Sequence, residues 1–87
     1  MSSPNIILIM TDQQRWDTVA CNGYPHMITP HIDALARRGV SFTHAFAQGA
    51  VCGPSRSSLV TGRLPHANGV LVNGLAPDTT IPNLGEL

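Results

Sequence analysis

The chain has 87 residues, of which 43% are hydrophobic and only 11% are charged. Ordinary soluble domains carry roughly 25% charged residues, so this sequence has few charges with which to cover a surface of its own. The net charge is zero, lysine is absent, and the five arginines form no basic stripe. Nucleic acid and anionic membranes are therefore not expected as partners.

The N-terminal residues lack the basic region and cleavage site that are typical of an export signal. The apolar run over residues 6–10 is also too short to span a bilayer. We therefore expect a cytoplasmic protein that does not enter a membrane. In that compartment Cys21 and Cys52 are expected to stay reduced rather than to form a disulfide.

The first predicted element is a strand over residues 6–10. A continuous apolar run without alternation is typical of a parallel strand that is buried on both faces. Asp12 follows this run, and open α/β sheets bind their ligands just past the carboxyl ends of the strands. Taken alone, Asp12 could equally cap a short helical segment over residues 15–20. The motif around Cys52 favours a role in a site.

Residues 29–46 predict a helix and then a second strand. Thr29 is suited to cap the helix, Pro30 to begin it and Gly39 to end it. Residues 40–46 alternate between apolar and polar side chains, which indicates a strand. A strand, a helix and a strand in this order form a crossover unit of a parallel sheet. The expected fold class is α/β, with a mostly parallel sheet flanked by helices.

The stretch 51–63 carries the motif around which the functional argument is built. Pro54 is suited to the first position of a helix, and Gly62 can close that helix in the left-handed conformation. Cys52 would then lie just before the helix N-terminus, among unpaired N–H groups, with Arg56 about one turn further on. A thiol, free amides and a guanidinium that meet at one point can bind an anion.

Other sites with similar components fit less well. Cysteine phosphatases separate their cysteine and arginine by five residues, whereas three lie between Cys52 and Arg56. The sequence contains neither Gly-x-Ser-x-Gly nor a nucleotide-binding P-loop. Cys21, His26 and His31 are spaced too widely for the paired ligands that are usual in structural zinc sites.

The remaining residues predict turns and the beginning of one more helix. Residues 64–70 form a turn around Asn-Gly, residues 70–72 are apolar, and Asn73-Gly74 turns again. Residues 80–87 begin a helix with Pro82 near its first turn. We expect residues 1–87 to be the N-terminal portion of one larger α/β domain, truncated within that last helix.

The stretch around Cys52 resembles the signature of the type I sulfatases, Cys-x-Pro-Ser-Arg followed by a spacer and Thr-Gly-Arg. The residues that match it are Cys52, Pro54, Ser55, Arg56, Leu59, Thr61, Gly62 and Arg63. Residues 29–42 are also similar to the family phrase Thr-Pro-Asn-Leu-Asp followed by Gly-Val-x-Phe. The resemblance implies an alkaline-phosphatase-like fold, of which this chain would be the N-terminal part.

In that family the cysteine is oxidised to formylglycine, so the resemblance assigns this modification to Cys52. The partner would be a formylglycine-generating enzyme or an anaerobic sulfatase-maturating enzyme. The hydrated aldehyde would act as the nucleophile on a sulfate ester, and Arg56 would orient it. The resemblance also gives Asp12 and the modified Cys52 as ligands of a divalent metal, foremost Ca²⁺, with Mg²⁺ or Mn²⁺ as alternatives.

Gln13 departs from the family pattern, because many sulfatases carry a second aspartate there. An amide oxygen can still bind a hard cation. The Asp12-Gln13 pair is similar to that of phosphonate monoester hydrolases, in which an asparagine placed like Asn73 faces the substrate. The expected activity is sulfate ester hydrolysis. Hydrolysis of phosphonate monoesters or phosphodiesters stays open as an alternative, as does a non-catalytic thiol at Cys52.

Overall fold

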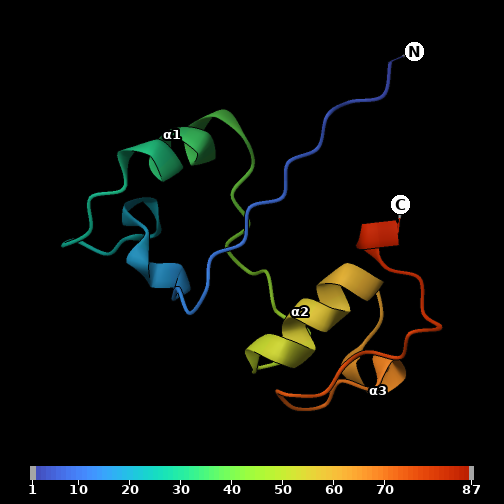
Figure 1. Cartoon of the computed structure of the whole chain (residues 1–87). Coiled ribbons are helices and arrows are strands. Elements are labelled where there is room, and N and C mark those ends of the chain that lie inside the picture. The colour runs from blue at the N-terminus through green and yellow to red at the C-terminus, as the bar shows by residue number, and fades with distance from the viewer. Residues whose placement is uncertain (1, 87) are drawn as a thin grey trace. The chain divides into compact units, whose positions relative to one another are not determined.

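The structure is a computed structural model that describes residues 2–86 (Figure 1). The chain divides into two compact units, Met1–Thr43 and His44–Leu87, which are described separately below. The first unit contains the 3-10 helices η1 (Trp16–Thr18) and η2 (Ala20–Asn22) and the α-helix α1 (Pro30–Arg38). The second contains the α-helices α2 (Cys52–Thr61) and α3 (Pro65–Asn68) and the 3-10 helix η3 (Leu84–Glu86).

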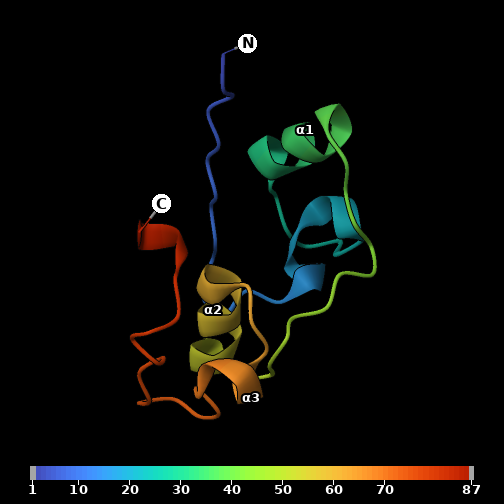
Figure 2. The same ribbon diagram turned by 90° about the vertical axis from the view of Figure 1, so that its right-hand side faces the viewer.

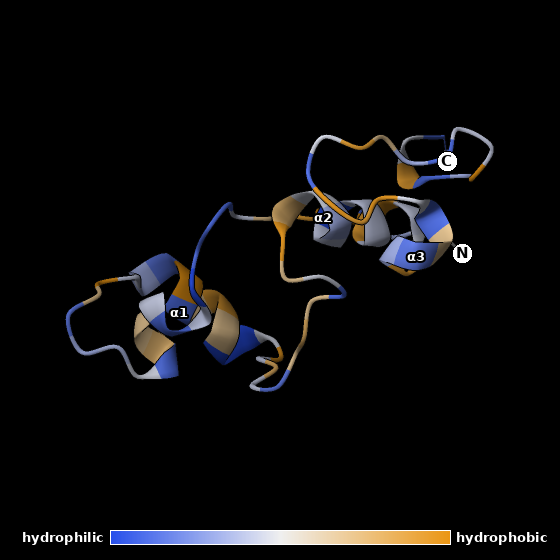
Figure 3. Ribbon diagram, turned by 90° about the horizontal axis from the view of Figure 1, so that it is seen from below, coloured by the Kyte–Doolittle hydropathy of each residue, from blue (hydrophilic) through white to orange (hydrophobic). Residues whose placement is uncertain are grey.

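Helix α1 begins and ends where the sequence predicts. Pro30 is its first residue, and the N–H of Gly39 closes it on the carbonyl of Leu35 at 2.9 Å. Its ribbon carries both hydrophobic and hydrophilic segments, which is typical of an amphipathic helix (Figure 3). The helix was therefore predictable from local signals alone.

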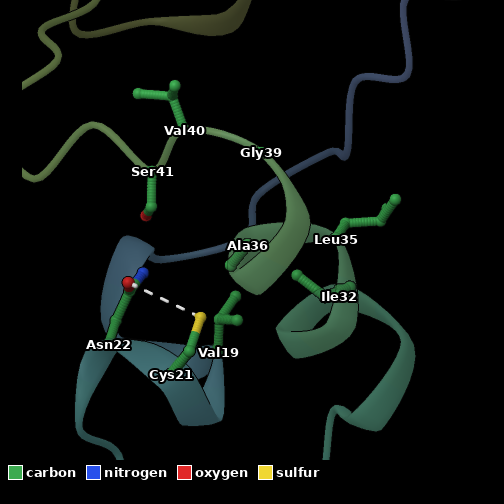
Figure 4. Close-up of a pocket in the computed structure, with 9 residues that line it drawn as sticks. All are labelled: Val19, Cys21, Asn22, Ile32, Leu35, Ala36, Gly39, Val40 and Ser41. Atoms are coloured by element: carbon green, nitrogen blue, oxygen red, sulfur yellow. Dashed lines mark hydrogen bonds between the residues drawn. The ribbon is translucent and has the colours of Figure 1, made fainter.

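The hydroxyl of Thr29 does not cap α1 and instead connects the helix to η2. Thr29 Oγ1 accepts a hydrogen bond from the N–H of Ala20 at 2.9 Å and donates one to Asp33 Oδ1 at 3.0 Å. The same carboxylate oxygen accepts the N–H of Cys21 at 3.0 Å. Beside these bonds, η2 and α1 line an open pocket of about 260 Å³ with side chains that include Val19, Ile32 and Leu35 (Figure 4).

The predicted sheet is not confirmed, because residues 2–86 contain no strand. Residues 6–10 run as an extended segment (Figures 1 and 2), and Ile6 and Ile7 are 87% and 84% exposed. Val40 and Phe42 of the second predicted strand are exposed as well. A strand exists through its hydrogen bonds to a neighbouring strand. No segment among the described residues supplies those bonds.

Helix α2 begins two residues earlier than predicted, so Cys52 is its first residue and not the residue before it. Val51 is the N-cap, and its carbonyl accepts the N–H of Ser55 at 3.1 Å. Pro54 therefore occupies the third helical position, where the missing N–H costs nothing because that donor has no intrahelical acceptor. Gly62 ends the helix with a φ of 65°, as predicted.

The segment after α2 forms a short helix, α3, where the sequence predicted only a turn. Its last residue is Asn68, which is completely buried. Asn68 Nδ2 donates to Thr61 Oγ1 at 3.4 Å and to the carbonyl of Arg63 at 3.2 Å, and Oδ1 accepts the N–H of Val70 at 2.9 Å. Val70 is also buried, with 2% of its surface exposed. Asn68 thus joins the end of α2, helix α3 and the following segment.

The last predicted helix is present only as the 3-10 turn η3. Asn83 supports this turn, because its Oδ1 accepts the N–H of Gly85 at 2.8 Å and its Nδ2 donates to Glu86 Oε1 at 3.0 Å. Leu87, the last residue of the predicted helix, lies outside the described residues. Within residues 2–86, every helix is too short or too polar to cross a membrane.

Candidate functional site

The candidate nucleophile, Cys52, lies at the N-terminus of α2. Its side chain is exposed and carries a free thiol. Arg56 is four residues further along the same helix, and side chains at this spacing lie on one helix face. The N-terminal end of a helix also favours negative charge through its dipole. The local structure therefore places the sulfur of Cys52 at a helix end that favours an anion, with Arg56 about one turn further along the same helix.

Asn73 contacts this helix end from a distant part of the sequence. Its Oδ1 accepts the backbone N–H of Gly53 at 2.7 Å and the thiol of Cys52 at 3.3 Å. The first N–H groups of a helix have no partner within the helix, and a side-chain oxygen commonly satisfies one of them. Here that oxygen comes from Asn73, twenty residues beyond the donor.

Gly53 makes this contact possible. A Cβ atom at position 53 would lie 2.6 Å from Asn73 Oδ1 and 3.4 Å from Asn73 Cα. The first distance is far below a van der Waals contact, and the atom concerned is the one that accepts both hydrogen bonds. Asn73 can therefore approach α2 in this way only when residue 53 has no side chain.

The predicted site residues fall into two groups. Cys52, Arg56 and Asn73 belong to the second unit, whereas Asp12 and Gln13 belong to the first. The structure brings Cys52 and Asn73 into contact, and the association of Asp12 with Cys52 stays a prediction.

The capping role for Asp12 is not observed. The N-cap of η1 is Arg15, and no side-chain hydrogen bond caps that end.

Asp12 and Gln13 offer two oxygen donors for a hard cation. Gln13 has a φ of 52°, an uncommon conformation for a residue that is not glycine. Calcium takes six to eight oxygen ligands, including carboxylates and amide carbonyls, so these two residues fit part of such a shell. Within residues 2–86, no three side chains among His, Cys, Asp and Glu are grouped so that they could hold a metal.

The second cysteine, Cys21, lies in a different environment from Cys52. Desolvation raises the pKa of the Cys21 thiol above its ordinary value, and the hydrogen bond and negative charge of Asp33 raise it further. Burial also raises the pKa of Asp33, but hydrogen bonds from Cys21 and Thr29 outweigh it, so that pKa is lowered overall. A raised pKa lowers the fraction of reactive thiolate at Cys21.

Sequence reasoning missed Asn68 and the pairing of Gly53 with Asn73. A signal for α3 was present, because Pro65 can begin a helix and Gly69, four residues later, can end one. The left-handed φ of 82° at Gly69 confirms that ending. The contact between Gly53 and Asn73 had no comparable signal, since it joins residues twenty positions apart.

Comparison with known proteins identifies the family. A family model described as Sulfatase matches residues 4–87, nearly the whole chain. The chain belongs to the sulfatase family. Membership implies the alkaline-phosphatase-like fold, of which the described residues show only helical and irregular segments.

Relatives in this family include bacterial and human proteins. The chain is 45% identical over 74 residues to an ulvan-active sulfatase of Formosa agariphila, an alignment that covers 85% of this chain and 14% of the relative. It is 40% identical over 76 residues to human arylsulfatase A, covering 87% and 15%. It is 35% identical over 86 residues to the uncharacterized sulfatase YidJ of Escherichia coli, covering 99% and 17%. The chain thus spans about one-seventh of the length of these sulfatases. No solved structure matches it.

Proposed function

We propose that this chain is the N-terminal portion of the catalytic domain of an enzyme that hydrolyses sulfate esters. The observation that carries the proposal is the position of Cys52 in a sulfatase-family sequence. Its exposed thiol lies at the first residue of α2, with Arg56 on the same helix face. The substrate would be a small sulfate ester, which carries the negative charge that this helix end favours.

Maturation would convert Cys52 to formylglycine. In net terms this is a two-electron oxidation of the β-carbon, in which the C–S bond breaks and sulfur leaves at the oxidation level of sulfide. Water supplies the balancing oxygen, and the oxidant is provided by a formylglycine-generating or anaerobic sulfatase-maturating enzyme. Hydration of the aldehyde then gives two hydroxyl groups on one carbon.

One of these hydroxyls would attack the sulfur of the ester, and the alcohol would leave as the S–O bond breaks. The second hydroxyl then loses its proton, the aldehyde re-forms, and sulfate is released. Arg56 can donate charge-assisted hydrogen bonds to the hydrated aldehyde and hold it for attack. The N-terminal end of α2 adds a fixed positive potential at the same place.

Asp12 and Gln13 would hold a divalent cation, with Ca²⁺ the best match to oxygen ligands and Mg²⁺ or Mn²⁺ as alternatives. A bound cation would supply Lewis-acid stabilisation of negative charge. These two residues give only part of an oxygen shell, so the other ligands would come from elsewhere in the full-length protein.

A second candidate substrate class is phosphonate monoesters or phosphodiesters. Two features favour it: Gln13 follows Asp12, and Asn73 lies next to Cys52, where it could also contact a bound ester. The deciding measurement is kcat/KM on an aryl sulfate and on the matching aryl phosphonate. A clear preference for the sulfate removes this alternative.

The proposal is tested in the full-length protein, produced together with its maturation enzyme. Peptide mass spectrometry should find formylglycine at position 52, and Cys52→Ala should lose sulfatase activity by several orders of magnitude. Cys21→Ala is the matched control and should keep activity. Active enzyme with only an unmodified thiol at position 52 would refute the proposed maturation. Wild-type activity in Cys52→Ala would refute the catalytic assignment and favour a non-catalytic role for the thiol.

A further inference from the structure

We propose that Asn73 is a positioning residue that holds the side chain at position 52 against the first turn of α2, and that Gly53 is required to admit it. The inference rests on the proposed function in that position 52 is taken as the nucleophile. Its structural part, the restraint on the thiol, stands on contacts in the second unit alone.

The restraint comes from one oxygen atom with two donors. The bond from the Gly53 N–H to Asn73 Oδ1, at 2.7 Å, fixes the amide relative to the helix backbone. The bond from the Cys52 thiol, at 3.3 Å, then fixes the direction of the side chain at position 52. A carbonyl oxygen has two lone pairs, so both bonds form at once.

Asn73 is itself held in place by the buried centre of the second unit. Three residues before it, Val70 is buried and its N–H is bonded to Asn68 Oδ1. Immediately after it, Gly74 adopts a φ of 90°, which turns the chain away. The side-chain amide of Asn73 therefore contacts α2 from a short segment between the buried Val70 and the turn at Gly74.

Maturation would leave this restraint in place. In the hydrated aldehyde, a hydroxyl oxygen replaces Sγ on the same β-carbon and can donate to Asn73 Oδ1 as the thiol does. With one hydroxyl held by Asn73, rotation about the Cα–Cβ bond is limited and the other hydroxyl has a defined direction. Orientation of this kind affects the rate of attack more than the binding of the ester.

The first experiment measures the thiol directly, in full-length protein produced without the maturation enzyme. Iodoacetamide labelling followed by peptide mass spectrometry gives the alkylation rate of Cys52, and Cys21 in the same sample is the internal control. The thiol must leave Asn73 to react, so Asn73→Ala should speed alkylation of Cys52 by about two- to fivefold. Asn73→Asp keeps an acceptor oxygen and should not speed it.

A double-mutant cycle separates the proposed contact from a general loosening of the structure. Gly53→Ala should displace Asn73 and speed alkylation of Cys52 about as much as Asn73→Ala does. The double variant should be no faster than Asn73→Ala alone, because the same hydrogen bond is lost only once. An unchanged Cys52 rate in Asn73→Ala, or effects that multiply in the double variant, would overturn the inference. If Cys21 also reacts faster in a variant, that variant has unfolded. The alkylation rates of Cys52 in Gly53→Ala and in Asn73→Asp then test the proposal.

The second experiment uses the matured enzyme, with formylglycine content checked by mass spectrometry in every variant. Asn73→Ala should lower kcat at least tenfold with a smaller change in KM, because orientation of the nucleophile is lost. A rise in KM at constant kcat would instead make Asn73 a substrate contact only. If wild-type protein lacks formylglycine or sulfatase activity, the proposed function fails, while the alkylation experiment still decides whether Asn73 restrains Cys52.

Discussion

At the scale of single residues, the second unit uses two asparagines for different purposes. Asn68 is fully buried and uses both its amide nitrogen and its oxygen to join three segments. Asn73 is exposed and uses its oxygen at the end of α2. The buried amide of Asn68, whose hydrogen bonds are satisfied, contributes to stability, whereas the proposed role of the exposed amide of Asn73 is to orient the side chain at position 52.

Asp78 gives a pH dependence that can be measured. Its carboxylate accepts the N–H of Thr80 at 2.9 Å and the hydroxyl of Thr80 at 2.8 Å. These bonds lower the pKa of Asp78, burial opposes them, and the charge of Arg63 lowers the pKa further. A carboxyl whose pKa is lower in the folded state stabilises the protein above its unfolded pKa, about 3.9, and this contribution is lost as the pH falls through the folded value.

We therefore expect Asp78→Asn to be less stable than wild type at pH 7, with the difference shrinking as the pH falls below about 4. The measurement is the urea midpoint of the full-length protein between pH 7 and pH 3. Thr80→Val keeps the backbone donor and should show a weaker form of the same dependence. A difference between wild type and Asp78→Asn that does not change with pH would contradict this assignment.

At the scale of elements, prediction succeeded where the signals are local. Pro30 and Gly39 mark the ends of α1, and both ends are where the sequence predicts them. The start of α2 was predicted two residues late, because Pro54 is tolerated at the third helical position as well as at the first.

Prediction was not confirmed where an element depends on distant partners. The apolar run 6–10 was interpreted as a strand from a pattern of burial, but a strand forms only when a neighbour supplies its hydrogen bonds. The candidate site divides in the same way. Cys52 and Arg56 were predicted as site residues from their spacing in one motif. The contact of Asn73 with Gly53 needs three-dimensional information, since sequence separation alone says nothing of a distance.

At the junction between α2 and α3, a single substitution is expected to lower the stability of the fold. Asn68→Ala should lower the free energy of unfolding by about 2–4 kcal/mol, because it leaves the N–H of the buried Val70 without its partner and removes the hydrogen bonds from Asn68 Nδ2 to Thr61 and to the carbonyl of Arg63. Chemical denaturation of the full-length protein would measure this. His66→Ala, an exposed position on the same helix, is the matched control and should change stability by less than about 0.5 kcal/mol.

At the scale of the whole molecule, the chain buries very little. Among residues 2–86, Val70 and Ile81 are the buried hydrophobic residues, whereas the run 6–10 is exposed. The hydroxyls of Ser57 and Ser58 are buried without a hydrogen-bond partner, which is unfavourable. So small a hydrophobic core gives little stabilisation against the loss of chain entropy on folding.

We therefore expect residues 1–87 alone to be inactive and poorly folded. Circular dichroism during heating should show a shallow change and no sharp transition, and the protein should associate at high concentration through its exposed apolar segments. Size-exclusion chromatography in the same buffer would report that association. A monomer with a sharp, cooperative melt would show instead that these residues are a domain in their own right.

The close approach at Gly53 has a consequence for how related sequences diverge. A Cβ at position 53 would lie 2.6 Å from the oxygen of Asn73. The residue type at either position therefore restricts which side chains fit at the other. A lineage that gains a side chain at position 53 should lose the asparagine at position 73 or move it. The two positions are thus expected to covary, although twenty residues separate them, and an alignment of homologous sequences would reveal it as a pair inherited together.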